Sequence, residues 1–299
     1  MSANVTSTMN ATQTSNCSNP VTEAKGIGFT FAYSFILIVS LIGNGFIGLI
    51  VFKSKTMRRP INFLIVNMAM SDLMFPVFVF SRIITQIQTN SWIISGSPGQ
   101  VLCKLISFLS EVSVAVSIQS LVLIAVDRFV AVVYPLRSPV VGSKRCPFFI
   151  LATWILAMAI KFPYLIAFEL VEYPSARIEC EPHWEKVFGH TSNFTDYVLA
   201  NIITLYYMPL VLIAVLYIII VFKLKLQVVR GSAQSVTAEQ QRFKIERNVL
   251  KMSTSIVLMF AICQLPATIY YLLYFFSRDL TVRHSCGFAH FHSILSLKL

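Results

Sequence analysis

Six apolar blocks, each long enough to cross a lipid bilayer, constrain this chain more than any other feature. A membrane-spanning helix needs roughly 20 mostly apolar residues, and these blocks contain few charges. The blocks are Ile27–Phe52, Asn62–Arg82, Val101–Val133, Cys146–Phe168, Tyr197–Phe222 and Ile245–Phe276. Charged residues make up 12% of the chain, against about 25% in soluble domains. The sequence therefore predicts an all-α membrane protein.

The formal net charge of +11 would also suit a nucleic-acid-binding protein, but the placement of the basic residues argues against it. Fourteen of the 24 Lys and Arg residues lie in three segments, 53–59, 137–145 and 223–251, which connect alternate blocks. Short loops rich in Lys and Arg stay on the cytoplasmic side of a membrane. We therefore expect a multi-pass plasma-membrane protein with an extracellular N-terminus, and no nucleic-acid partner.

Four Asn-x-Ser/Thr glycosylation motifs support the same orientation. They start at Asn4, Asn10, Asn16 and Asn193. Three lie in a polar tail, residues 1–26, and the fourth follows the fourth block. Such acceptors belong on the outer side of the membrane. The chain is thus divided into an extracellular glycosylated tail, 1–26, and a helical membrane domain, 27–299.

A seventh apolar run begins near Cys286 and is shorter than the others. Its uncharged stretch, 286–297, would make roughly 18 Å of helix at 1.5 Å per residue, too little for a hydrocarbon core of about 30 Å. The fold expected is a seven-transmembrane helix bundle whose seventh helix is incomplete.

The six cysteines fall into two groups. Cys146 and Cys263 lie within apolar blocks and are expected to be buried free thiols. The other four lie on the outer side, where disulfides form. Cys103 heads the third block and Cys180 lies in the following outer loop, which suits a bridge. Cys17 and Cys286 are a second possible pair, the alternative being two unpaired thiols.

Asp72 lies in the middle of the second block, where a carboxylate needs a partner, a proton or a cation. Asn44 lies at a similar depth in the first block, and Ser117 could supply an oxygen from the third. One interpretation is that these residues bind a sodium ion; we expect no cofactor besides it. The other is a protonated or water-bridged Asp72 in a polar bundle core.

Asp127-Arg128-Phe129 stands at the inner end of the third block. Adjacent opposite charges neutralise each other, and Arg128 could also reach Glu246 at the inner end of the sixth block. The alternative is that Arg128 extends to the membrane surface. Pro209 and Pro266 lie within the fifth and sixth blocks, where proline kinks helices.

Together these motifs resemble the class A, rhodopsin-like, G-protein-coupled receptors over about 27–280. The first four helices match at Asn44, Asp72, Cys103, Asp127-Arg128-Phe129 and Trp154, with Pro135 in an inner loop and Cys180 in an outer one. Pro209 and Tyr217 match the fifth helix, and Phe260-x-x-Cys263-Gln264-x-Pro266 matches the sixth. The stretch from Asn62 to Leu73 resembles the peptide-receptor branch.

The resemblance implies a role for each of these residues, and no enzymatic activity. Arg128 would pair with Asp127 and Glu246 at rest and face a heterotrimeric G protein, with Tyr217, on activation. Ile118, Pro209, Phe260, Gln264 and Pro266 would transmit the signal. Asn44, Asp72 and Ser117 would line the sodium pocket. Arrestin would be a further partner, alongside the lipid bilayer.

Three departures from the family pattern bear on these roles. Phe129 replaces a tyrosine, which is a mild change. Gln264 replaces the tryptophan of the sixth helix and so removes a bulky switch under the ligand pocket. No Asn-Pro-x-x-Tyr motif follows Pro266, and its start would fall near or just past residue 299.

Three features of the sequence bear on the class of ligand. Ser110 stands where amine receptors carry an Asp, which disfavours an amine. Ile106 holds the usual counterion position of an opsin. Loop 169–196 has six acidic and two basic residues, a net −4, which would attract cations. We therefore expect a basic or amidated neuropeptide, although the loop could simply be a solvated one. The ligand-pocket candidates are Ser110, Glu111, Glu179, Glu181 and Gln264.

Lys161, inside the fourth block, could pair with Glu111 or extend outward. An opsin-like or other small-ligand receptor remains the alternative within the class. A membrane transporter is the alternative from another class, but paired broken helices in two halves are not found in the sequence. The five His residues show no metal-ligand spacing inside a block.

We predict that the 299-residue chain activates G proteins weakly and that a longer gene product carrying Asn-Pro-x-x-Tyr activates them strongly. The reason is that the last helix would otherwise lack the segment that completes the bundle. A G-protein assay in cells compares the two products. Robust activation by the 299-residue chain would contradict this prediction.

Overall fold

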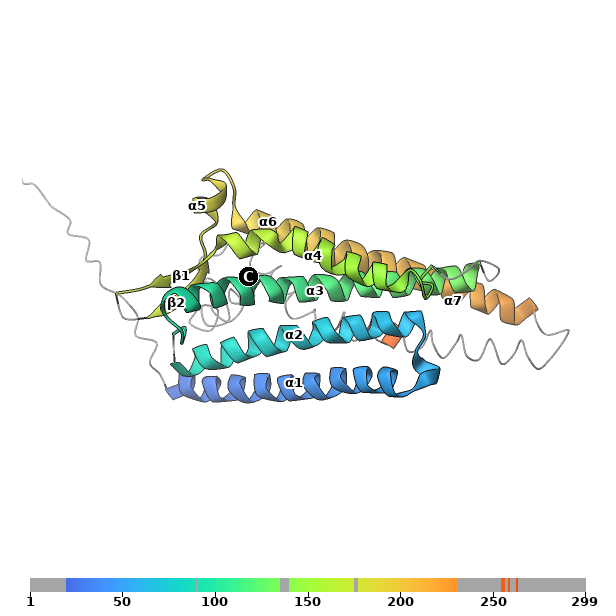
Figure 1. Ribbon diagram of the computed structural model, residues 1–299, viewed down its shortest axis with the longest axis horizontal. Helices are drawn as coiled ribbons and strands as arrows, with labels where there is room; N and C mark the ends of the chain where they lie inside the picture. Colours follow the sequence, from blue (N-terminus) through green and yellow to red (C-terminus); the bar gives the residue numbers. More distant parts are fainter. Residues whose placement is uncertain are drawn as a thin grey trace, which may run out of the picture.

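The computed structural model describes residues 20–89, 91–134, 140–174 and 177–230, together with 254–255, 258 and 262. In this part of the chain, five helices are long and apolar enough to cross a membrane. They lie side by side along the long axis of the molecule (Figure 1). The chain is therefore organised as a multi-pass helix bundle. The sixth and seventh blocks lie almost wholly outside the described residues.

Each of the first five predicted blocks forms a helix, in most cases one longer than expected. Charged or polar residues at the ends join the helix because its backbone hydrogen bonds extend past the apolar stretch. The helices are α1 (Pro20–Lys53), α2 (Pro60–Thr89), α3 (Gly96–Val133), α4 (Cys146–Ala167) and the continuous run of α6 (Phe194–Asn201), η2 (Ile202–Tyr207) and α7 (Met208–Arg230). A 3-10 turn, η1 (Lys55–Met57), joins α1 to α2.

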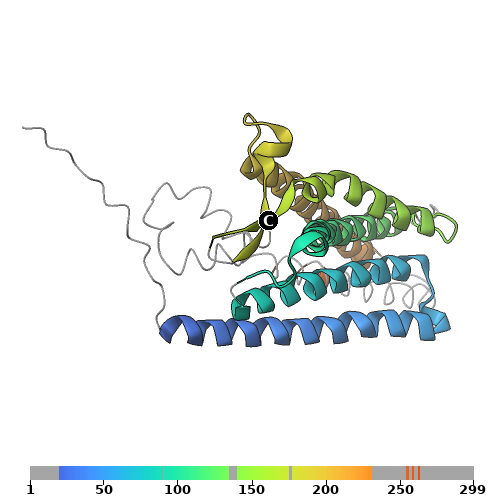
Figure 2. The ribbon, with the colours of Figure 1, turned by 60° about the vertical axis from the view of Figure 1, so that its left-hand side comes forward.

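Helix α3 occupies the centre of the bundle. It packs against α2, α4 and α7, whereas α1 packs against α2 (Figures 1 and 2). One face of α3 is small and hydroxylic, and small side chains let neighbouring membrane helices approach closely. Its buried serines are Ser107, Ser110, Ser113, Ser117 and Ser120. Because this face is small, α2 and α4 come close enough to α3 to bond with its polar side chains.

The fifth helical run changes its geometry before its proline. Residues Ile202–Tyr207 form a π-helical segment, η2, immediately before Met208 and Pro209. Proline lacks the N–H that an α-helix uses for its i→i−4 bond, and π-turns of this kind re-aim a helix locally. The predicted irregularity at Pro209 is thus present, one turn earlier and as a wider turn.

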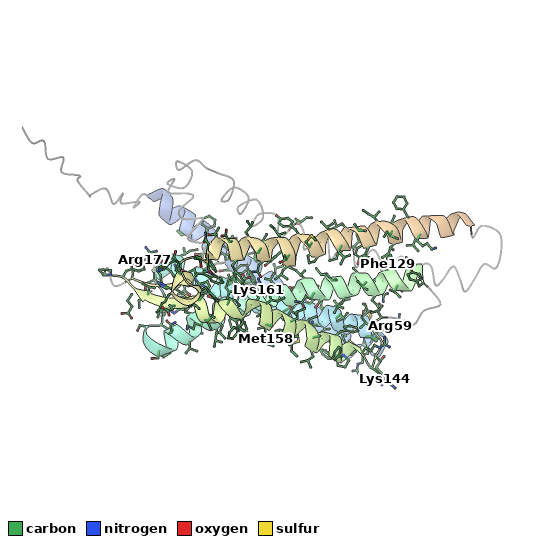
Figure 3. The ribbon with its side chains drawn as sticks, turned by 90° about the horizontal axis from the view of Figure 1, so that it is seen from above. Arg59, Phe129, Lys144, Met158, Lys161 and Arg177 are labelled. Carbon is green, nitrogen blue, oxygen red and sulfur yellow. A yellow bond between two sulfur atoms is a disulfide. The ribbon has the colours of Figure 1, made fainter. Side chains whose placement is uncertain are left out.

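The loop after α4 was predicted only as an acidic connection, but it has regular structure. Strand β1 (Phe168–Glu172) pairs antiparallel with β2 (Ile178–Pro182), and Leu170 lies opposite Cys180. A short helix, α5 (Trp184–Phe188), follows. We call the end of the bundle that carries β1, β2 and α5 the hairpin end. The opposite end, with Arg59 and Lys144, is the basic end (Figure 3).

The disulfide predicted between Cys103 and Cys180 is formed, with a Cα–Cα distance of 5.7 Å. It joins β2 to the first turns of α3. Further contacts hold the same hairpin. The Gln100 side chain accepts from the Leu170 N–H at 2.7 Å, and the Trp92 N–H donates to the Ile178 carbonyl at 2.7 Å. The hairpin is therefore fastened to α3 and to the segment between α2 and α3.

Candidate functional site

At the basic end, the charged pair predicted at the end of α3 is in contact. Arg128 Nη2 lies 2.6 Å from Asp127 Oδ2, and Asp127 is 1% exposed. The other carboxylate oxygen, Asp127 Oδ1, accepts from the Val141 N–H at 3.0 Å. Asp127 thus ties the end of α3 to the segment before α4, and it holds the Arg128 guanidinium at the same time. Arg128 does not simply extend to the membrane surface.

Midway along the bundle, the Asp72 carboxylate accepts a hydrogen bond from the Ser117 hydroxyl. The Ser117 and Ser71 hydroxyl oxygens lie 2.7 Å apart. Asn44 is directed elsewhere, since its amide nitrogen donates to the Ser40 carbonyl and hydroxyl oxygens at 3.2 Å each. Two of the three residues expected in the sodium pocket therefore meet, and Asn44 is bonded within its own helix.

A polar contact among α2, α3 and α4 was not predicted as a unit. The Asn67 amide donates to Ser120 Oγ at 3.0 Å and to Thr153 Oγ1 at 3.4 Å. Its carbonyl oxygen accepts from Trp154 Nε1 at 2.8 Å. A polar group inside a bilayer is costly without a hydrogen-bond partner, so the bonds of Asn67 favour one mutual arrangement of the three helices. An asparagine amid an apolar block is the signal that could have indicated it.

Lys161 pairs with Glu111, which decides between the two alternatives left by the sequence. Lys161 Nζ lies 2.9 Å from Glu111 Oε2, and the two side chains are 1% and 12% exposed. The ammonium also lies 5.5 Å from the centre of the Tyr164 ring. Met158, one turn earlier on α4, is 40% exposed (Figure 3). Helix α4 thus carries a buried charge at Lys161 and an exposed apolar side chain at Met158.

At the hairpin end, the acidic residues of the loop are largely engaged with neighbours. Lys186 donates to both carboxylate oxygens of Glu169, at 2.9 and 2.8 Å, and this lowers the pKa of Glu169. Burial, and then a hydrogen bond with Glu181, raise the pKa of Glu179, which also contacts Arg177. Because Glu169 and Glu179 each pair with a basic residue, part of the acidic charge of this loop is compensated within the loop.

The ligand-pocket candidates occupy different settings. The Ser110 hydroxyl is buried and donates within α3 to the carbonyls of Ile106 and Ser107. Glu111 is held by Lys161. Glu179 and Glu181 lie on β2, where Glu181 accepts from the Tyr173 hydroxyl at 3.0 Å and so raises the pKa of Tyr173. None of these four lines the cavity described next.

A cavity of about 210 Å³ lies at the hairpin end between α2, α3 and the segment that joins them. Arg82 and Trp92 line it, and each is buried, at 8% and 9% exposed. The sequence placed Arg82 at the end of the second block. That placement of Arg82 was wrong, because α2 continues two turns further to Thr89.

Of the residues expected to transmit a signal, Ile118 is buried on α3, and Pro209 lies at the start of α7. Tyr217 is buried against Met68, Leu121 and Ala125. Cys146 is a buried free thiol at the start of α4, as predicted.

Outside the described residues lie Glu246, Phe260, Gln264, Pro266, Cys17, Cys286, Asn4, Asn10 and Asn16. Asn193 is exposed and caps α6, its side-chain oxygen accepting from the Thr195 N–H.

Comparison with known proteins decides the family. Residues 43–297 match the family model described as 7 transmembrane receptor (rhodopsin family). The chain belongs to this family of seven-transmembrane receptors. Its fold class is therefore the seven-helix bundle, of which α1 to α4 and the run from α6 to α7 are the first five helices.

Relatives in the same family carry names that refer to peptides. The chain is 30% identical over 249 residues to a QRFP-like peptide receptor of Branchiostoma floridae, covering 81% of this chain and 63% of the relative. It is 28% identical over 254 residues to the Substance-P receptor of Homo sapiens, with 84% and 60% covered. The chain thus spans less than two thirds of the length of these relatives.

The buried pair generates a prediction about stability. Glu111→Gln or Lys161→Met alone leaves one buried charge without its counterion, which costs about 3–5 kcal/mol. Replacing both residues with Met removes both charges and should recover most of that loss. Thermal unfolding of the purified protein in detergent, followed by intrinsic fluorescence, measures the order of stability.

The exposed pair Lys186 and Glu169 provides the control, because its side chains are 66% and 28% exposed. Lys186→Met should change the free energy of unfolding by about 0–1 kcal/mol. A double variant of Glu111 and Lys161 less stable than both single variants would contradict the account of the buried pair.

Proposed function

We propose that this protein is a plasma-membrane receptor that conveys the binding of an extracellular peptide, a neuropeptide by class, to a cytoplasmic heterotrimeric G protein. In this proposal the hairpin end and the N-terminus face the outside and the basic end faces the cytoplasm. The role is a ligand-driven shift between two conformations, without covalent chemistry.

The contact at the end of α3 is the observation that carries this proposal. Arg128 is held by Asp127 at the end of the bundle that holds the basic loops. Its Nε atom finds no hydrogen-bond acceptor among the described residues. A guanidinium held by one carboxylate and retaining a free donor is suited to exchange partners when helices move. We propose that Glu246 is its second partner at rest, and that Tyr217 supports the active state.

The nature of the ligand follows from the hairpin end and from the relatives. The relatives named above are peptide receptors by name. Glu172, Glu185 and Asp196 are exposed here, and Glu169, Glu179 and Glu181 are partly exposed. They would favour a peptide with basic residues. The bridged hairpin stands above the bundle as a fixed platform, which suits a ligand larger than a single amine.

We further propose that the Asp72 cluster binds a sodium ion. Sodium prefers oxygen ligands, and the Ser117 hydroxyl contacts both the Asp72 carboxylate and the Ser71 hydroxyl, so that oxygens of three residues lie together. When bound, the ion would supply the positive charge that a carboxylate at this depth lacks. The hydrogen bonds of Asn44 to Ser40 leave it outside this set in the described conformation.

The function is tested by expressing the receptor from its full-length gene in cells and screening peptides for G-protein activation. Arg128→Ala should lower maximal activation roughly tenfold or more, corresponding to about 1.4 kcal/mol of coupling. Surface binding of a labelled active peptide should be retained, because Arg128 lies at the far end of the bundle.

Arg59→Ala is the matched control, since Arg59 is exposed at the same end. It should leave both readouts near the wild-type values. Ion or solute flux in place of G-protein activation, or full activation by the Arg128→Ala variant, would overturn the proposal.

The sodium proposal predicts that sodium chloride raises the melting temperature of the purified receptor relative to N-methylglucamine chloride, by roughly 2–4 °C. Asp72→Asn should abolish that difference because it removes the anionic ligand. Asp196→Asn, the same change at an exposed site, should preserve it. An undiminished sodium response in the Asp72→Asn variant would exclude the site.

A further inference from the structure

Arg82 is a buried cation for which the described part of the chain supplies no counterion. It is 8% exposed, and its Nε and Nη2 atoms have no hydrogen-bond acceptor there. None of the described carboxylates lies within salt-bridge distance of it, in contrast to the buried Lys161, which has Glu111. A charge inside a membrane helix is costly and is usually retained for a functional reason. The guanidinium therefore has unused capacity to bind an anion.

The cavity of about 210 Å³ places that capacity next to open space. Its wall is mostly apolar, with Val77, Ile94, Leu102 and Ile106 among the residues that form it. The polar lining residues are neutral apart from Arg82, and no acidic side chain of the described chain lines the cavity. Because an apolar wall strengthens electrostatic interactions, a single cation here determines the sign of the charge that the cavity accepts.

Trp92 positions the guanidinium and adds a second donor. The carbon centre of the Arg82 guanidinium lies 5.1 Å from the centre of the Trp92 ring. This contact holds one face of the guanidinium but occupies none of its N–H groups. Trp92 Nε1 is likewise buried without an acceptor among the residues described. Two sets of unused donors thus line one cavity, and the backbone bond from Trp92 to Ile178 fixes the tryptophan to the hairpin.

We propose that Arg82, with Trp92, binds a carboxylate group of the ligand. Guanidinium and carboxylate form two parallel hydrogen bonds in one plane, and the indole N–H adds a third donor. A neutral amide carbonyl would satisfy one donor and leave the charge uncompensated. The proposal rests on the proposed function and sharpens it, because it predicts a free acid, C-terminal or side-chain, where the sequence suggested a basic or amidated peptide.

The hairpin and the cavity then select for different parts of one ligand. The acidic side chains of the hairpin disfavour small anions as they approach, whereas the cavity requires an anionic group. A peptide whose exposed part is basic or neutral and whose inserted part carries a carboxylate satisfies both conditions. The two surfaces together favour a peptide over a small free acid as the physiological ligand.

The test compares two probes that differ in one group, 3-phenylpropanoate and 3-phenylpropanamide, on the purified full chain in detergent. At millimolar concentration, the acid should raise the melting temperature and the amide should raise it much less. Arg82→Gln should remove the effect of the acid. Arg82→Lys should retain part of it, because it keeps the charge but loses the two-point geometry. Trp92→Phe should weaken it by a smaller factor.

Arg177→Gln is the matched control, because Arg177 is an exposed arginine at the same end of the molecule. It should leave the effect of the acid unchanged. Equal stabilisation by acid and amide would overturn the proposal, as would an acid effect that survives in the Arg82→Gln variant. If Arg82→Gln fails to fold, the Arg82→Lys and Trp92→Phe variants decide. A rise in melting temperature with the acid equal to that of the wild type in both variants would overturn the proposal.

For a peptide found in the signalling screen, the free acid and the amide of the same sequence distinguish a C-terminal carboxylate from an acidic side chain. Because the thermal assay uses neither a G protein nor a peptide, its failure would leave the receptor proposal standing. Conversely, a carboxylate effect without any peptide signalling would refute the receptor proposal alone.

Discussion

The internal satisfaction of polar groups is the constraint on which this bundle depends. Hydrocarbon offers no hydrogen bonds, so a polar side chain inside the membrane is costly unless it bonds to another part of the protein or to a ligand. Asn67 does so by bonding to Ser120, Thr153 and Trp154. A second cross-link joins Glu111 to Lys161. Both involve the central helix α3, so the positions of α2 and α4 follow from the polar partners that α3 presents to them.

The two ends of α3 are organised differently, and this difference suits a device that transmits a signal. At one end, a disulfide and backbone hydrogen bonds fasten the hairpin to Cys103 and Trp92. At the other end, the bond between Asp127 and Arg128 is electrostatic and reversible. The covalently fixed end can hold a shaped surface for a ligand, whereas the charged end can exchange partners without breaking a covalent bond.

Features set by one residue and its depth could be predicted from the sequence, and features set by the choice among several possible partners could not. Block length indicated five of the helices, and the cysteine positions indicated the disulfide. Depth alone suggested that Asn44 would meet Asp72, but the Asn44 side chain bonds to Ser40, one turn earlier in the same helix. Arg82 was taken as the end of a block because charge usually marks the membrane boundary. The strands β1 and β2 were missed because their many acidic residues resemble those of a solvated loop.

The central claim is that the hairpin end, with Arg82, faces the ligand side and that Arg128 faces the cytoplasm. Two exposed lysines report on it directly, Lys186 beside the hairpin and Lys55 at the basic end. Intact cells are treated with a membrane-impermeant amine-reactive biotin, and the labelled peptides are identified by mass spectrometry. The account predicts label on Lys186, and label on Lys55 only after permeabilisation. Label on Lys55 but not on Lys186 in intact cells would contradict it.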